Sequence, residues 1–242
     1  MNITELMQRA THSLRVLCDH PGYLMFSGGH DFDDYLRVLR EKIAGCTASP
    51  PKMRVSLMFL DEPERQEMYR HQVHPDAVDE QTWNRWLARE TFGRQRDDGS
   101  EEEGRLPSFW ARSARIIGSS AEELPASLSV DQFVERFLAA NTAIRNQYLM
   151  GASVHDLRFR DAEDNPTARR NGPAVYFWLR DENDPREAEA VFVIVPLDSV
   201  EERPREQGFS TRDPELINAL VGVFERYRLA TTPGEKMLGS SL

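Results

Sequence analysis

Over the first ninety positions, the spacing between apolar residues alternates between that of a helix and that of a strand. Apolar positions at helical spacing predict a helix over 3–17. The run Tyr-Leu-Met-Phe at 23–26, with glycines just behind it, is typical of a buried strand that ends in a tight turn. A helix is expected over 33–44, and the RVSLMFL run at 54–60 predicts another strand. This alternating order indicates an α/β fold with a parallel strand pair.

The second half of the chain begins with a capping box, Ser-Val-Asp-Gln at 129–132, which predicts the start of a long helix. A strand is expected near 153–159. Two strong β runs at 174–179 and 190–195 are joined by an acidic stretch, which predicts a long hairpin. Asp-Pro-Glu at 213–215 is typical of a final helix, with aspartate at the cap and proline in the first turn.

These elements predict one α/β domain over 1–230, a mixed sheet flanked by helices, followed by a tail at 231–242. Another helix is expected over 79–92. The charged stretch 94–106 has no apolar anchor before its end, so we expect a mobile loop that proteases cut first. The side chains that should be buried together are Phe133, Phe137, Ile144, Val175, Phe177, Phe192, Ile194, Leu216 and Leu220.

The net charge of −10 argues against a general binder of duplex DNA, which needs a basic face. No apolar run approaches the ~20 residues of a membrane helix, and the first residues lack the pattern of a signal peptide. The cysteines, Cys18 and Cys46, are too few for a disulfide scaffold and fit a reducing cytoplasm. The motifs GxxxxGK[ST], GxGxxG, HExxH, CxxC pairs and GxSxG do not occur, and no cofactor is expected.

The most suggestive local motif is Ser27-Gly28-Gly29-His30, followed by Asp31. At the start of a helix, backbone N–H groups and the helix dipole favour an anion. The alternative is an ordinary turn whose aspartates cap the helix. The string resembles the SGGxDS phosphate loop of PP-loop ATP pyrophosphatases, which implies a nucleotide-handling hydrolase or transferase. Phe32 departs from that loop, because the family has a phosphate-contacting serine there.

Two guanidinium groups, Arg169 and Arg170, precede the strongest predicted strand. They could hold a phosphate or a carboxylate, and the alternative is a solvated loop. If this loop approached the Ser27–His30 turn, the two together would form a site for a small anionic ligand. Arg180 and Asp181, at the far end of the same strand, are expected to form a surface pair.

Glu67, His71 and His74 stand at positions i, i+4 and i+7, a spacing that places side chains on one face of a helix. One carboxylate and two imidazoles on one helix face could ligate a metal. Pro75 follows at once, and surface polar residues at this spacing are common, so no metal site is predicted.

The order of elements also resembles the phospholipase-D-like superfamily. The similar segments are the strand ending in an acidic turn at Val55–Asp61 and the Gly208–Ile217 segment, followed by a helix that runs to Phe224 and Tyr227. Active members carry H-x-K-x4-D, and no histidine here has lysine two positions later. The resemblance therefore implies a non-catalytic module for ligand sensing or protein interaction, in regulation or defence, whose partner is another protein or a second copy.

Overall fold

The computed structural model describes residues 2–26, 30–60, 80–95, 101–102, 104–120, 123–157, 175–194 and 207–231. Its elements in chain order are α1 (Ile3–Arg9), β1 (Ser13–Leu17), α2 (Asp31–Cys46), β2 (Arg54–Leu60), α4 (Glu80–Phe92), β3 (Arg94–Gln95), β4 (Glu101–Glu102), α5 (Leu106–Ile117), α6 (Val130–Tyr148), β5 (Ser153–Leu157), β6 (Val175–Arg180), β7 (Glu189–Ile194), β8 (Gln207–Thr211) and α8 (Pro214–Thr231).

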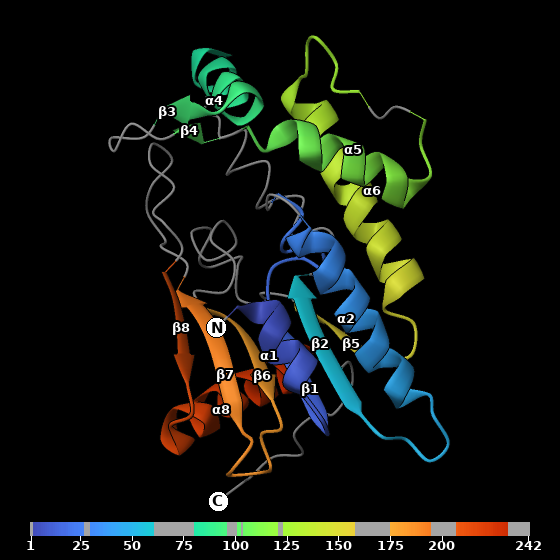
Figure 1. Cartoon of the computed structure of the whole chain (residues 1–242), viewed down its shortest axis with the longest axis vertical. Helices are drawn as coiled ribbons and strands as arrows, with labels where there is room; N and C mark the ends of the chain where they lie inside the picture. The colour runs from blue at the N-terminus through green and yellow to red at the C-terminus, as the bar shows by residue number, and fades with distance from the viewer. Residues whose placement is uncertain are drawn as a thin grey trace, which may run out of the picture.

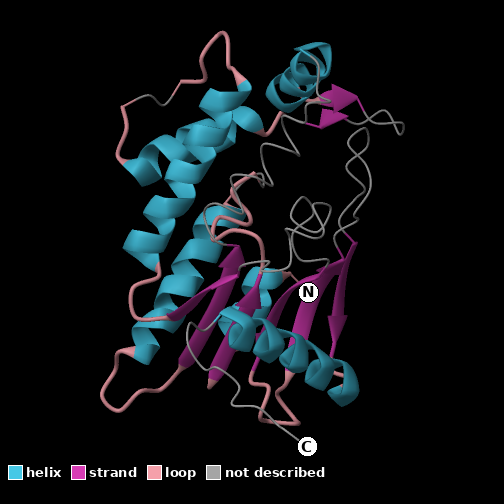
Figure 2. Cartoon of the chain, turned by 180° about the vertical axis from the view of Figure 1, so that it is seen from behind, coloured by secondary structure: helices cyan, strands magenta, loops and turns pink. Residues whose placement is uncertain are grey.

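A six-stranded mixed sheet forms the base of the molecule, in the order β5-β2-β1-β6-β7-β8. The strands β5, β2 and β1 are parallel to one another, whereas β6, β7 and β8 join as antiparallel neighbours. Helices α1 and α2 cover one face, and α8 crosses the other (Figures 1 and 2). The predicted α/β class, with a mixed sheet flanked by helices, is confirmed.

Helices α4, α5 and α6 extend beyond the carboxyl end of β2 and form the upper part of the view in Figure 1. The segment that follows β1 packs against this part through aromatic rings. The Phe26 ring stacks on Phe109 of α5 with centroids 4.4 Å apart, and Phe133 and Phe137 of α6 complete the cluster. The capping box at Ser129 is present, since its side chain accepts from the Gln132 N–H at 3.2 Å.

Several predicted elements are confirmed within a few residues, including the strand at 54–60 and the β6–β7 hairpin. The strand at 54–60 has a parallel partner as expected, but that partner is β1 rather than the run 23–26. The predicted core is wrong at its outer edge. Ile194 and Leu216 are 47% and 38% exposed, and Val175 and Phe192 are only half-buried. The remaining predicted core residues are buried. The exceptions lie on β7 next to the last strand, at the first residue of β6, or on the first turn of α8.

The prediction for the first 26 residues is wrong in two places. The helix expected over 3–17 ends at Arg9, and 13–17 forms the central strand β1. The run 23–26 belongs to turns rather than a strand, and it packs its rings against α5 and β6. Helix α5 and strand β8 were not predicted.

Part of the expected loop 94–106 is described. There, β3 pairs with β4, and Arg105 bonds Glu90 at 2.9 Å. The mobility of this stretch and the extent of the domain stay predictions. The tail 232–242 lies outside the described residues. No helix in the described part of the chain is long and apolar enough to cross a membrane.

Candidate functional site

The carboxyl end of β1 is where the direction of the sheet changes. On one side β1 pairs with parallel β2, and on the other with antiparallel β6. The chain leaves β1 toward β2, moves outward to β5 and then returns to β6 on the other side of β1. In open α/β sheets ligands bind outside the carboxyl ends of strands at such a switch point. The geometry therefore directs attention to Cys18, Asp19 and His20, which follow β1.

A buried chain of polar side chains occupies this position. The Nε2 of His20 lies 3.5 Å from Oδ1 of Asp19, and its Nδ1 lies 3.2 Å from Oδ1 of Asn141 on α6. All three side chains are buried. The β1–β2 ladder continues past the strand end, because the Leu60 N–H donates to the Asp19 carbonyl at 3.2 Å. This bond holds the backbone of Asp19 beside the last residue of β2.

The orientation of Asn141 is set by its other contacts. Its Nδ2 donates to the Phe137 carbonyl at 2.9 Å, so its Oδ1 faces the Gly22 N–H at 2.9 Å and the His20 ring. Both ring nitrogens of His20 therefore face oxygen acceptors.

Aromatic rings enclose this polar chain on two sides. The His20 ring meets Phe137 edge-on, with centroids 4.8 Å apart. The Tyr23 ring lies 4.6 Å from that of Trp178 and 6.0 Å from that of Tyr176, both on β6. Gly22 is closely packed, since a Cβ placed on it would stand 3.0 Å from Asn141 Oδ1. The segment after β1 is thus held between α6 and β6.

Of the predicted anion-binding residues, the structure describes His30 alone; Ser27, Gly28, Gly29, Arg169 and Arg170 lie outside the described residues. His30 is exposed at the N-cap of α2, and its side chain makes no capping bond. Its carbonyl accepts from the Asp34 N–H at 2.9 Å. The approach of the turn to the Arg169–Gly172 loop stays a prediction.

The first turn of α2 carries Asp31, Asp33 and Asp34, which suit the positive end of the helix dipole. Arginines offset part of this negative charge. Asp33 pairs with Arg115 of α5 at 2.7 Å, and Asp34 pairs with Arg37 at 3.1 Å.

A buried cation also reaches the segment that leads into the glycine turn. Arg112 of α5 is 9% exposed, and its Nη1 donates to the Met25 carbonyl at 3.3 Å. Met25 stands two positions before Ser27 in the sequence. Burial lowers the pKa of Arg112, and the negative field of Asp33 opposes that effect. Arg112 thus carries positive charge to the Met25 carbonyl.

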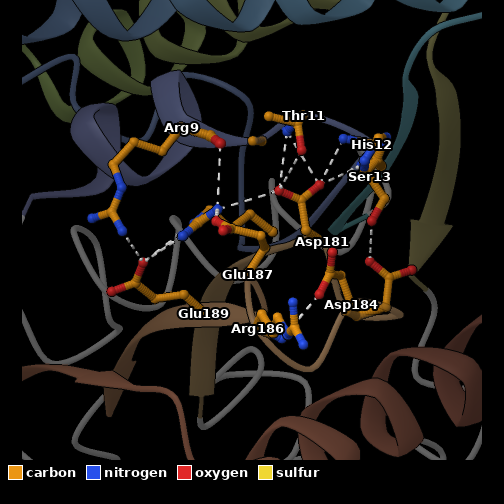
Figure 3. A network of polar contacts seen from close by, with 12 residues as sticks. Arg9, Thr11, His12, Ser13, Asp181, Asp184, Arg186, Glu187 and Glu189 are labelled. Atoms are coloured by element: carbon orange, nitrogen blue, oxygen red, sulfur yellow. Dashed lines mark hydrogen bonds and ion pairs between the residues drawn. The ribbon is translucent and has the colours of Figure 1, made fainter.

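At the other end of β1, Arg180 and Asp181 contradict the prediction of a surface pair. Both are 1% exposed, and they form the centre of an ionic network (Figure 3). The carboxylate of Asp181 accepts the backbone N–H groups of Thr11, His12 and Ser13 at 3.0, 2.6 and 3.0 Å. Asp181 has φ 49, a left-handed conformation that aspartate tolerates better than most residues. The pair is buried because α1 and the loop before β1 cover the end of β6.

Arg180 extends this network to the hairpin and to α1. Its guanidinium lies 3.1 Å from Glu189 and 3.2 Å from Glu187, and it donates to the Arg9 carbonyl at 3.3 Å. Glu189 also pairs with Arg9 at 2.8 Å and with Arg212 at 3.2 Å. These groups join α1, the β6–β7 hairpin and the end of β8, so the network has a structural role.

Sequence reasoning missed the buried site residues after β1. Cys18, Asp19 and His20 came directly after a segment predicted to be helical, and Asn141 had no motif around it. The available signal was a polar pair directly after an apolar run, which marks a strand end in an α/β sheet.

The remaining predicted chemistry, at Glu67, His71 and His74, lies outside the described residues. Among the residues that the structure does describe, no group of three or more His, Cys, Asp or Glu side chains could hold a metal ion. The sequence matches no protein-family model and no curated protein.

Proposed function

We propose that this chain is a non-catalytic, phospholipase-D-like module that senses a small anionic ligand at the carboxyl end of β1. The observation that carries the proposal is the buried Arg112, which donates to the carbonyl of Met25, two positions before Ser27 in the sequence. A buried cation on the segment that follows β1 at the sheet switch point, shortly before the glycines in sequence, suits a site for an anion that bonds backbone N–H groups.

The burial and contacts of His20 support a sensing role rather than phosphodiester chemistry. Among the described histidines it is the buried one, and oxygen acceptors of Asp19 and Asn141 face both of its ring nitrogens. A histidine that attacks phosphorus needs a nitrogen lone pair directed at the substrate. The sequence also lacks the H-x-K-x4-D motif throughout.

The test is a thermal-shift series with inorganic phosphate, ADP, and ATP with Mg²⁺. A ligand that binds only the folded state raises the melting temperature. We expect a rise for wild type, a smaller rise for Arg112→Gln, and recovery in Arg112→Lys, which restores the charge. Arg115→Gln is the matched control, because Arg115 lies on the same helix and is 62% exposed in its side chain.

Three results overturn the proposal. The first is a shift of equal size in wild type and Arg112→Gln, and the second is no shift with any of these anions. The third is release of phosphate or pyrophosphate from ATP, which indicates the nucleotide-handling enzyme suggested by the Ser27–Asp31 motif.

A further inference from the structure

A long groove follows the outer side of α6. It has a volume of about 900 Å³ and is lined by α6 from Asp131 to Gln147, together with Ile117 of α5. A helix rises about 1.5 Å per residue, so this stretch of α6 is about 24 Å long. Figures 1 and 2 show α6 at the outer margin of the helical part of the molecule. Another side of α6, with Phe137 and Asn141, faces the segment after β1, so the groove is separate from the proposed anion site.

The lining residues of α6 form two neighbouring rows on the helix surface. One row runs from Val134 to Asn146 and the other from Asp131 to Gln147, each with a spacing of four residues. Rows of this spacing are the ridges of a helix, and the furrow between two of them accepts a ridge of another helix. The shape of the groove therefore fits a helix better than a strand or a compact ligand.

The middle of the groove is apolar and has short side chains. Val134 is 5% exposed, and Leu138, one turn further along the same row, is half-buried. In the neighbouring row, Ala139 is exposed and Ala143 is half-buried. Neither alanine has a side chain beyond Cβ, so the backbone of another helix can come close to α6 here. Such a floor suits the apolar stripe of an amphipathic helix.

The charged groups of the groove are all of one sign. Asp131 and Glu135 lie one turn apart in the first half of α6, both are exposed, and none of the described lining residues is basic. No ion pair joins either carboxylate to another described residue. Like charges at this spacing destabilise a helix, and the helix dipole offsets the effect best in the first turn, where Asp131 lies. Cations of a partner would relieve the repulsion and pair with both carboxylates.

We propose that this groove binds a basic amphipathic helix of a partner protein, antiparallel to α6. The apolar stripe of the partner helix packs on Val134, Leu138 and Ala139, and its lysines or arginines contact Asp131 and Glu135. The antiparallel direction places these cations in the last turns of the partner helix, where they also suit its own dipole. Binding at the groove does not require the anion site, so it goes beyond the proposed function.

Fluorescence anisotropy with the full-length protein and two designed peptides tests the proposal. The first is an alanine-based helical peptide of about seventeen residues, the length of the groove, with leucines at helical spacing and lysines in its last two turns. The second has glutamates in place of the lysines. We expect saturable binding of the lysine peptide and much weaker binding of the glutamate peptide.

Two variants of exposed groove residues separate the contributions of shape and charge. Ala139→Arg fills the floor with a bulky cation and should weaken binding of the lysine peptide by more than about tenfold. Glu135→Lys replaces an attraction by a repulsion, so it should weaken that binding about fivefold and improve binding of the glutamate peptide. Ala219→Arg and Glu215→Lys, the same changes at exposed positions of α8, are the matched controls and should bind as wild type does.

The proposal is wrong if the lysine peptide does not bind saturably, if Ala139→Arg binds it as wild type does, or if Glu135→Lys keeps the wild-type preference between the peptides. Circular dichroism checks that each variant is folded, and Glu135→Lys decides the outcome if Ala139→Arg is not. Analytical ultracentrifugation of the protein alone tests the other occupant, a second copy. A dimer that Ala139→Arg dissociates would assign the groove to self-association and overturn the proposal.

Discussion

The carboxylate of Asp181 accepts the backbone N–H of Ser13 at 3.0 Å, across 168 positions of sequence. This bond joins the residue that follows β6 to the first residue of the central strand β1. The N–H groups before a strand have no ladder partner of their own, and the aspartate provides one. The contact fixes the start of β1, and β1 in turn positions Asp19 and His20 at its other end.

Replacing Asp181 with alanine should lower the free energy of unfolding by about 3–5 kcal/mol, because it leaves the N–H groups before β1 without their acceptor and removes one of the carboxylates around the buried Arg180. Urea denaturation measures this change. Glu187→Ala is the control, since its side chain is 54% exposed and it touches the same arginine. An exposed ion pair contributes about 0–1 kcal/mol. Equal losses in the two variants would contradict a central role for Asp181.

The ionic network should make the protein sensitive to acid. Burial raises the pKa of Asp181, but the N–H donors of Ser13, His12 and Thr11 outweigh it, so the pKa lies below the ordinary 3.8. Burial also opposes the charged form of Glu189, but hydrogen bonds from Arg212 and Arg180 bring its pKa below 4.5. Carboxylates with a lowered pKa stabilise the fold above those ordinary values, and the stability is lost as the pH falls through the lowered values.

Melting curves between neutral pH and pH 2 measure this sensitivity. The melting temperature of wild type should be steady at neutral pH and fall in acid. The melting temperature of Asp181→Asn should start lower and fall less steeply, because this variant has one fewer carboxylate to protonate. A variant whose curve runs parallel to wild type through the acid range would show that Asp181 does not contribute to the effect.

Asn141 should be a main support of the segment after β1. Asn141→Ala removes the acceptor for the Gly22 N–H and the partner of His20 Nδ1. Each buried group left without a partner costs about 1–3 kcal/mol. Asn146→Ala, an exposed position on the same helix, should change stability by less than about 0.5 kcal/mol. Chemical denaturation compares the two, and an equally mild effect at both positions would show that Asn141 is dispensable.

Truncating a side chain buried beneath α8 should cost more stability than truncating one on the exposed side of that helix. Phe177→Ala removes a fully buried ring from the face under α8 and should cost about 3–5 kcal/mol. Leu216→Ala, on the exposed side of the first turn of the same helix, should cost less than about 1 kcal/mol. Thermal unfolding gives both values, and a loss at Leu216 as large as that at Phe177 would restore the original core prediction.

The sequence predicted elements whose apolar pattern has one period and a clear end signal. The capping box at Ser129 and the Asp-Pro start of α8 are of this kind, and both helices are present. The run at 13–17 was misassigned because β1 is buried on both faces. A strand without an exposed face lacks alternation, so its apolar residues also fit a helical period.

Tertiary packing decided the other differences. The run 23–26 has the composition of a strand, but its rings pack between α5, α6 and β6, and the chain there turns. Strand β8 has one aromatic residue among polar ones, and in the described part of the chain it pairs with β7 alone. Arg180 and Asp181 looked like surface charges because no local pattern shows that α1 will cover them.

The most direct test of the proposed ligand site is a titration of the isotope-labelled protein with inorganic phosphate, followed by backbone amide resonances. We predict saturable shifts of the Gly28 and Gly29 amides and of the neighbouring 20–26 segment, lost in Arg112→Gln and kept in Arg115→Gln. Shifts that do not saturate, or that are as large at the other helix starts as at this turn, would contradict an anion site at the carboxyl end of β1.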